Sequence, residues 1–288
     1  MQRLHQHQPG MNVREVSQIL DLSRGGYYAH RGQPLGKRRT QDAALAIEVQ
    51  QVFHASRGVY GCPRIMHALR HKGLRHGKNR IARLMRAHGC HVQQKRRFVP
   101  RTTVVNKDAP VAPNHLLHRP TVQRLNEVWL TDITYLPTAE GWLYLAAEMD
   151  ACSRRIIGWS THPSLATALP TAALERALES RHEASLPDVL HHSDRGCQYT
   201  SEAFRRRLAL CGITQSMSRK ANCYDNAAME SFWATLKAEC FGSTIPATRS
   251  AARSMVFDYI ETFYNPVRLH SALGFQSPVA FEQSSKQN

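Results

Sequence analysis

The sequence has no CxxC motif, no long apolar run and, over its first half, few acidic residues. Its seven cysteines are scattered and include no CxxC pair, which excludes a disulfide framework and a zinc ribbon and predicts reduced cysteines in the interior. No stretch approaches the roughly 18 consecutive apolar residues of a membrane span, and the first residues include no apolar core of signal-peptide length. We therefore expect a cytoplasmic protein, whether Met1 or Met11 is the natural start.

The shortage of acidic residues divides the chain into two parts. Residues 1–125 hold 23 Lys and Arg against 5 Asp and Glu, a net charge of +18, whereas residues 126–288 hold 15 against 17, a net charge of −2. Because each Lys or Arg that meets a phosphate releases condensed counterions, this dense basic region predicts a nucleic acid as the partner. A membrane surface is the competing partner, but it would need a helix with a bulky apolar face, which this region lacks.

The basic part of the chain is expected to be helical. A segment at 1–40 places apolar residues at helical spacing and offers Ser23 as a cap, a pattern that fits a helix-turn-helix fragment and an ordinary helical hairpin equally well. A basic helical block follows over residues 41–105, and its last helix could insert into a DNA groove. In this block we expect DNA contacts from Arg64, Lys78, Arg80 and Arg83.

A proline-containing linker, residues 106–122, separates the basic part from an α/β core. The pattern beyond it predicts a core over residues 123–245 and a helical extension over residues 246–288. Strands first and then alternating helix and strand indicate a mixed sheet with helices on both faces. Strands are expected at 128–136, 143–149, 155–161, 189–193 and 213–217, and helices at 168–182, 201–211, 225–240 and 251–264.

Three acidic residues of the core are candidates for a metal site. Asp132 lies inside an apolar strand, Asp194 ends a buried strand, and Glu230 lies on a later helix. Each has an ordinary explanation: Asp132 could pair with an arginine, Asp194 could begin a turn, and Glu230 could be a surface residue. Together they predict a catalytic site, because three carboxylates can hold two divalent cations about 3.5–4 Å apart, the arrangement that serves phosphodiester transfer.

Several segments, in chain order, are those of a known family. They read RGVYGCPRI, WLTDITYL, GWLYLAAEMDACSRRIIGW, HHSDRGCQYTS, SMSRKANCYDNAAMESFWATLKAE and YIETFYNPVRLHSALGFQSP, and 35 residues separate Asp194 from Glu230. With this order and spacing the chain resembles the downstream-frame (OrfB-type) protein of two-frame insertion sequences, the IS-three family of transposases, which shares the spacing with retroviral integrases. The resemblance covers most of the chain.

The resemblance implies a ribonuclease-H-like, integrase-like core in which Asp132, Asp194 and Glu230 bind two Mg²⁺ ions, for which Mn²⁺ can substitute. It implies that water cleaves DNA at the element's end and that the freed 3′-OH then attacks another DNA phosphate. The implied partners are the element's terminal repeats, the target DNA, further copies of the chain and an upstream-frame protein joined to it as a frameshift fusion. Binding to DNA would make the protein nucleoid-associated. We further expect DNA contacts from Asn226, Lys237, Arg219, Lys220 and Arg268.

Other functions and sites are compatible with parts of this pattern. A nuclease on the same core and a catalytically silent, DNA-binding regulator of transposition are the two rival functions. His67 and His71 have helical spacing for a metal, but the CxxC half of a zinc domain is missing. The four tryptophans are assigned to the core, whereas Tyr199 and Tyr224 could stack on an unpaired base.

Overall fold

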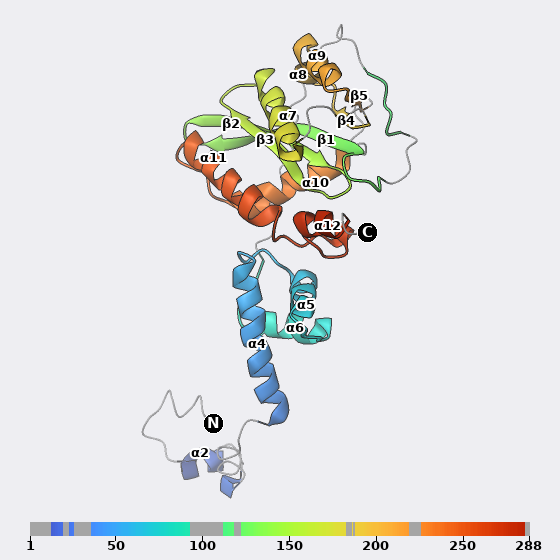
Figure 1. Cartoon of the computed structure of the whole chain (residues 1–288). Helices are drawn as coiled ribbons and strands as arrows, with labels where there is room; N and C mark the ends of the chain where they lie inside the picture. The colour runs from blue at the N-terminus through green and yellow to red at the C-terminus, as the bar shows by residue number, and fades with distance from the viewer. Residues whose placement is uncertain are drawn as a thin grey trace.

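The computed structural model describes residues 13–19, 23–25, 36–92, 112–117, 122–182, 186, 188–218 and 226–285. Within them, a helical module and an α/β domain lie on either side of a carboxy-terminal extension (Figure 1). Of the predicted segment 1–40, the structure describes the short helix α2 (Val13–Ile19) and a few residues besides, and most of the predicted linker lies outside the described residues. No helix among the described residues is long and apolar enough to cross a membrane.

Three helices form the module that follows α2: α4 (Lys37–Ala55), α5 (Cys62–His71) and α6 (Lys78–Ala87). Their apolar sides meet in one core, in which Val49, Ile65 and Ile81 are fully buried. Pro63 suits the first turn of α5, because a residue there needs no N–H for a helical hydrogen bond. After α5, Gly73 takes a left-handed φ of 81°, which ends the helix.

The α/β domain is built on a five-stranded mixed sheet with the strand order β3-β2-β1-β4-β5. The first three strands pair antiparallel, whereas β4 pairs in parallel with β1, and β5 in parallel with β4. The strands are β1 (Val128–Thr138), β2 (Gly141–Asp150), β3 (Ile156–His162), β4 (Leu190–Ser193) and β5 (Thr214–Met217). The prediction of an α/β fold with a mixed sheet is confirmed, and β1 is its central strand.

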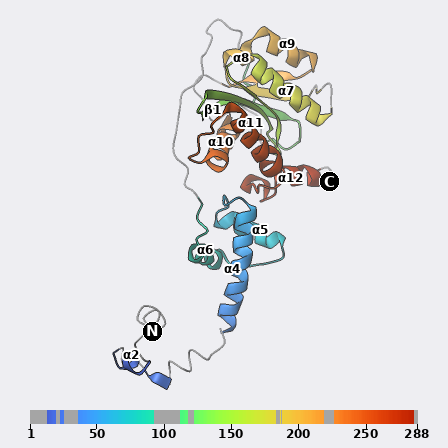
Figure 2. The ribbon, with the colours of Figure 1, turned by 90° about the vertical axis from the view of Figure 1, so that its left-hand side faces the viewer.

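Helices cover both faces of the sheet. Figure 2 shows α7 and α9 on one side of the sheet and α10 and α11 on the other. The close packing of α7 depends on Gly158 of β3, where an added Cβ atom would lie 2.2 Å from the carbonyl oxygen of Ala173. The helices of the domain are α7 (Ala168–Arg181), α8 (Cys197–Thr200), α9 (Glu202–Leu210), α10 (Ala227–Leu236) and α11 (Arg249–Phe257).

Two predicted helices, 225–240 and 251–264, change their winding before they end. The π-helical turns are Lys237–Phe241 after α10 and Asp258–Tyr264 after α11. They meet at a buried ion pair, in which Arg268 donates two hydrogen bonds of 2.7 Å to the carboxylate of Glu239. The hydroxyl of Tyr259 donates a third, of 2.8 Å, to the same carboxylate. Each π turn rotates the side chains after it relative to the helix before, which a regular helical period does not predict.

The extension also joins the helical module to the α/β domain. The hydroxyl of Tyr60 accepts a hydrogen bond of 2.7 Å from the backbone N–H of Leu269 and donates one of 3.1 Å to the carbonyl of Val267. At the same interface Arg57 pairs with Asp258 at 2.5 Å. The extension continues through a 3₁₀ turn (Ser271–Leu273) to the last helix, α12 (Pro278–Ser285).

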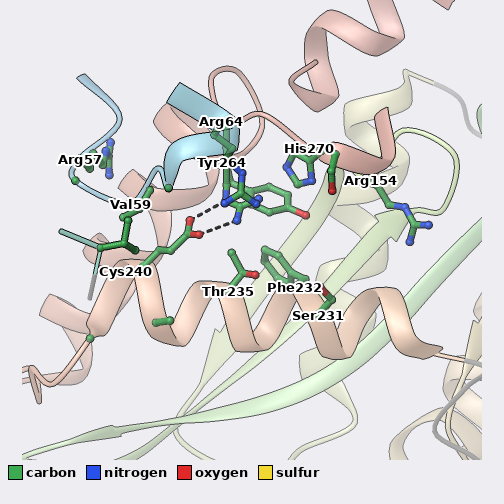
Figure 3. A pocket seen from close by; sticks show the side chains of 18 of the residues that line it. Arg57, Val59, Arg64, Arg154, Ser231, Phe232, Thr235, Cys240, Tyr264 and His270 are labelled. Carbon is green, nitrogen blue, oxygen red and sulfur yellow. Dashed lines mark hydrogen bonds and ion pairs between the residues drawn. The ribbon is translucent and has the colours of Figure 1, made fainter. Parts of the chain in front are cut away.

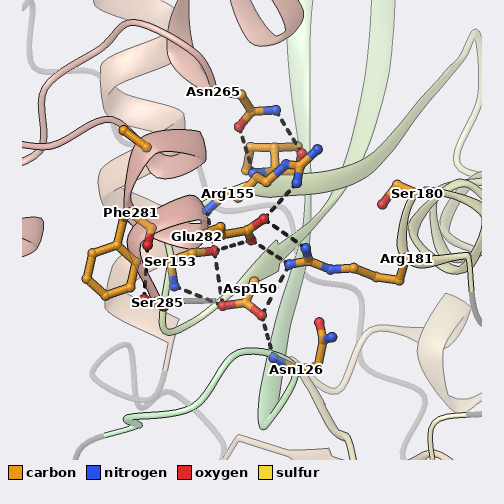
Figure 4. A network of polar contacts seen from close by, with 12 residues as sticks. Asn126, Asp150, Ser153, Arg155, Ser180, Arg181, Asn265, Phe281, Glu282 and Ser285 are labelled. Atoms are coloured by element: carbon orange, nitrogen blue, oxygen red, sulfur yellow. Dashed lines mark hydrogen bonds and ion pairs between the residues drawn. The ribbon is translucent and has the colours of Figure 1, made fainter. Parts of the chain in front are cut away.

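The helix α12 is fastened to the α/β domain through a buried network around Glu282 (Figure 4). The carboxylate of Glu282 accepts hydrogen bonds from Arg181 at 2.7 and 3.0 Å, from Arg155 at 2.7 Å and from the hydroxyl of Ser153 at 2.8 Å. Burial raises the pKa of Glu282, but the hydrogen bonds and the charge of Arg181, together with the other donors, lower it to about 2.

We predict that Glu282→Gln destabilises the protein by roughly 3 kcal/mol at pH 7, because a depressed carboxyl pKa is a stabilisation of the folded state. This stabilisation is complete above the unfolded pKa of about 4.3 and is lost as the pH falls toward 2, so the difference between variant and wild type should shrink over that range. Urea unfolding at several pH values measures it. The matched variant Glu202→Gln removes an exposed carboxylate and should change stability by less than about 0.5 kcal/mol; equal effects of the two variants would contradict the prediction.

Candidate active site

Two of the three candidate carboxylates meet because of how β1 and β4 pair. The parallel register sets Leu130 opposite His192; continued for two residues it leads to Asp132 and Asp194, which line the same cavity. Neighbouring strands lie about 4.8 Å apart, so side chains in register are close. Since β4 ends at Ser193 and β1 continues to Thr138, the edge of β1 beyond Asp132 is open. The two aspartates therefore lie at the carboxyl end of β4, where ligand sites of such sheets form.

A cavity of about 540 Å³ opens at this edge. Asp132 and Asp194 lie on its wall, and four of the nine other lining residues are aromatic. Tyr135 and Trp142 contact each other edge to face, with ring centroids 4.8 Å apart, and Trp142 is 46% exposed. Trp142 was assigned to the core, and the structure corrects this, because the turn between β1 and β2 holds it at the cavity.

The surroundings of Asp132 disfavour the ionised form of its carboxyl group. Burial, then the charge of Asp194 and, to a smaller extent, that of Glu230 raise the pKa of Asp132 to about 7. Hydrogen bonds oppose this rise, one of 2.8 Å from the backbone N–H of Ile133 and one of 3.0 Å from the indole N–H of Trp233. Asp194 accepts a hydrogen bond of 2.9 Å from the backbone N–H of Gly196. Both carboxylates are thus held in place by groups of the protein itself.

One side of α10 faces Asp132. Glu230, Trp233 and Lys237 follow one another at spacings of three and four residues, so they share a face of the helix. Trp233 contacts Asp132 directly, and the ammonium group of Lys237 lies 5.1 Å from the ring centroid of Tyr135. Burial lowers the pKa of Lys237, and the attraction of Asp132 opposes this. This face of the helix places the carboxylate of Glu230 and the ammonium group of Lys237 on the side of the two aspartates.

Glu230 itself is exposed and does not line the cavity. Within the ranges that the structure describes, no three His, Cys, Asp or Glu side chains are grouped closely enough to hold a metal ion. Glu230 is nevertheless near enough to raise the pKa of Asp132. The structure therefore brings Asp132 and Asp194 together and sets Glu230 beside them, on the solvent side.

Two residues near the site are less accessible than expected. Asn226 is 9% exposed, and its side-chain amide donates a hydrogen bond of 3.1 Å to the carbonyl of Thr131. It attaches the start of α10 to β1, so its expected contact with DNA is replaced by a structural one. Tyr199 is 1% exposed and its hydroxyl lies 3.2 Å from the hydroxyl of Thr131, which removes it as a stacking surface for a base. Arg219, Lys220 and Tyr224 lie outside the described residues.

The other expected DNA contacts divide into buried and exposed side chains. Arg268 is 4% exposed and paired with Glu239, which gives it a structural role in the fold. Arg64 donates a hydrogen bond of 2.9 Å to the carbonyl of Leu269. Arg80 and Arg83 both pair with Asp42, at 2.7 and 2.5 Å, and Lys78 is exposed at the start of α6.

The alternative zinc site is not supported among the described residues. The ring of His67 stacks on Phe275 with centroids 3.6 Å apart, which gives this histidine a packing role. A buried histidine–carboxylate pair beneath the site was not predicted from the sequence. In it, Nε2 of His191 on β4 lies 3.0 Å from the carboxylate of Glu148 on β2. Both side chains are fully buried.

We predict that Asp132→Asn stabilises the metal-free protein at pH 8 by roughly 3 kcal/mol, because the variant no longer bears the cost of a charge there. The folded pKa of Asp132 is raised, so wild-type stability falls as the pH rises from about 4 to 7. Near pH 4 the two proteins should be equally stable. Urea unfolding in EDTA at both pH values tests this, and a variant that is less stable than wild type at pH 8 would refute it.

Both parts of the chain match known protein families. Residues 40–98 match the family described as HTH-like domain, and residues 122–223 and 211–278 match two families described as Integrase core domain. Among solved structures, the chain is similar to a simian T-cell lymphotropic virus intasome in complex with a PP2A regulatory subunit (15% identity, TM-score 0.43, 71% of this chain and 66% of that one). It is also similar to the HTLV-2 integrase catalytic core domain in complex with magnesium (13% identity, TM-score 0.41, 54% of this chain and 95% of that one).

The relatives in sequence are proteins of insertion elements. The chain is 39% identical over 272 residues to the 31 kDa protein of insertion element IS600 from Shigella sonnei, which covers 94% of this chain and 99% of that protein. It is 37% identical to the transposase of IS904 from Lactococcus lactis, covering 86% and 96%, and 35% identical to the transposase InsF of IS3A from Escherichia coli, covering 98% of each chain. The chain therefore belongs to the IS3 (IS-three) family of insertion-sequence transposases, DNA-transposing proteins with an HTH-like domain and an integrase core.

Proposed function

We propose that this transposase cleaves and joins DNA by metal-dependent chemistry at Asp132, Asp194 and Glu230. The observation that carries the proposal is the pairing of Asp132 with Asp194 at an open strand edge, where burial and mutual repulsion raise the pKa of Asp132 to about 7. A divalent cation between the carboxylates would remove that repulsion, because it favours their charged forms.

The residues at the site fit magnesium. Their donors are carboxylate oxygens, the hard ligands that Mg²⁺ prefers, and Mg²⁺ keeps several waters, so few protein ligands are needed. We assign Asp132, Asp194 and Glu230 as the ligands of two Mg²⁺ ions, for which Mn²⁺ can substitute. Bound there, the ions would stabilise charge on the attacking and the leaving oxygen of the phosphodiester.

The protein's own groups keep these ligands in position. The N–H groups of Ile133 and Trp233 each bind one oxygen of Asp132, and the N–H of Gly196 binds Asp194. Lys237, half-buried at the end of α10, presents a cation beside the carboxylates. We assign Lys237 to a DNA phosphate near the reacting end, since a charged group in a partly buried position binds a phosphate more strongly than an exposed one does.

The proposed reaction has two phosphoryl-transfer steps. In the first, water attacks the phosphorus at the element's end, and the bond to the 3′ oxygen breaks to leave a free 3′-OH. In the second, this 3′-OH attacks a phosphorus of the target, and the target's own 3′ oxygen leaves. Each step forms one P–O bond and breaks one, so no covalent link to the protein is required.

The exposed face of α6 is the proposed site of duplex recognition by the HTH-like domain. Lys78, Arg83 and Arg86 lie on that face and are exposed, and a helix with such a face fits a major groove. We further propose that several copies act together on DNA, and that an upstream-frame protein joined to this chain assists in recognising the element's ends. The catalytic residues lie on the other module, so recognition and chemistry are divided between the two.

The proposal predicts that Asp132→Asn, Asp194→Asn and Glu230→Gln each abolish cleavage and joining while DNA binding survives, because an amide keeps the shape of the carboxyl group but does not hold a metal ion. The assay is labelled DNA with the candidate element ends and Mg²⁺, followed by mapping of nicks and joints. Glu202→Gln, on α9, is the matched control and should retain activity. Near-normal joining by any of the three variants would remove that residue from the site.

For Lys237, we predict that Lys237→Ala lowers the rate of end processing by roughly tenfold or more, the loss of a contact to a charged group, with little change in melting temperature. Activity on arbitrary duplex should fall less. Lys237→Arg keeps the charge and should recover part of the loss. Equal losses on element ends and on arbitrary DNA would favour a nuclease, and no loss on either would mean that Lys237 contacts no DNA.

A further inference from the structure

A second, larger cavity, of about 970 Å³, lies between the helical module, the extension and α10 (Figure 3). We call it the interdomain cavity. It is distinct from the carboxylate cavity, since the two share no lining residue. Figure 3 shows Ser231 and Thr235 of α10 on one side and Arg64 and His270 on the other. Both modules therefore contribute to its wall.

The wall of the interdomain cavity carries excess positive charge. Four arginines line it, and the single carboxylate among the lining residues is Glu239, which is paired with Arg268. Arg57 is paired with Asp258. Within the described part of the chain, no carboxylate forms an ion pair with Arg64 or Arg154.

Burial and the positive charge of this wall lower the pKa of His270. Its ring is largely buried in the wall, and its Nε2 has no hydrogen-bond partner among the described residues. Burial and the charges of Arg268, Arg64 and Arg154 lower the pKa of His270 to about 3, so the imidazole is neutral at pH 7 and adds no cation. Arg64, Arg154 and Arg268 come from three different segments and line the same cavity, and Arg64 and Arg154 are the two of them without an ion pair among the described residues, so this wall suits an anion.

The opposite wall leaves room for an extended ligand. The side of α10 that faces the cavity combines small side chains with the larger Phe232, and its π turn adds Glu239 and Phe241. From Ala227 to Gly242 this wall is about 20 Å long at 1.5 Å per residue. That length accommodates several phosphates of one strand, at about 3.4 Å per nucleotide in B-form DNA. The small lining residues of α10 and its π turn are Ala227, Ala228, Ser231, Thr235, Ala238 and Gly242.

We propose that the interdomain cavity binds the phosphate backbone of a DNA strand, with Arg64 and Arg154 as its phosphate ligands. The inference rests on the proposed function in that DNA is the substrate, but it assigns a separate binding site. A strand held there lies against α10, the helix that carries Glu230 toward the carboxylates. Because Arg64 comes from the helical module and Arg154 from the turn after β2, the site is complete only when the module is docked on the extension.

The test is binding of the full chain to an arbitrary duplex and to a single strand, each about 30 nucleotides long, in EDTA at several salt concentrations. We expect Arg154→Gln to weaken binding about tenfold and to reduce the slope of log K against log salt by about one, the loss of one phosphate contact. Arg206→Gln, which removes an exposed arginine of α9, should leave both quantities unchanged. Equal behaviour of the two variants would overturn the proposal.

A second pair of variants covers the case in which Arg154→Gln disturbs the fold. Ser231 is exposed on the wall of the cavity, so Ser231→Glu adds a negative charge there, and Ser231→Gln is the neutral control of equal size. We expect Ser231→Glu to bind DNA at least about tenfold more weakly than Ser231→Gln, and equal binding would refute the proposal. Inorganic phosphate at constant ionic strength should not displace the DNA; displacement would indicate a site for the free anion instead of a strand.

These binding assays contain no divalent cation, so their outcome does not depend on the carboxylates. Loss of activity in Asp132→Asn with full DNA binding by Arg154→Gln would leave the proposed function intact and refute the interdomain site. The reverse result, an active Asp132→Asn protein and weak binding by Arg154→Gln, would refute the proposed function and leave the interdomain site supported. The two proposals therefore fail separately.

Discussion

The repulsion between Asp132 and Asp194 is the constraint that the rest of the structure serves. The parallel pairing of β1 and β4 fixes the two carboxylates side by side, and partial burial raises the pKa of Asp132 to about 7. A fold selected only for stability would avoid this arrangement, because an uncompensated charge there destabilises the native state. The protein instead holds it with hydrogen bonds from Ile133 and Trp233 and surrounds it with the well-packed faces of a mixed sheet.

The helix α10 connects this site to the remainder of the chain. One of its sides carries Glu230, Trp233 and Lys237 toward Asp132, and another lines the interdomain cavity. The π turn after it aims Glu239 at Arg268, and this buried ion pair fastens the extension on which the helical module docks. Movement of the helical module would therefore be transmitted to α10, the helix that carries Glu230, through contacts that are packed and hydrogen-bonded.

Much of this organisation could be predicted from the sequence, because it depends on local patterns. Apolar periodicity and turn residues predicted the five strands and the main helices. The surroundings of Asp132, Asp194 and Glu230 in the sequence singled out these three carboxylates, and the spacing of the last two supported the family resemblance. Contacts between distant segments could not be predicted in this way: the buried pairing of Arg268 with Glu239 makes a basic residue structural, and Asn226 is turned inward to bind the carbonyl of Thr131. The two π turns were missed because a regular helical period contains no signal for an inserted residue.

The central claim is that the carboxylates of β1, β4 and α10 form one cation site. It is tested most directly by crystals of the full chain soaked in Mn²⁺, with data collected at the manganese absorption edge, in wild type and in Asp132→Asn. The account predicts an anomalous peak in contact with both Asp132 and Asp194 in the wild type, and its loss in the variant. A wild-type peak that touches neither aspartate, or one that persists unchanged in the variant, would contradict it.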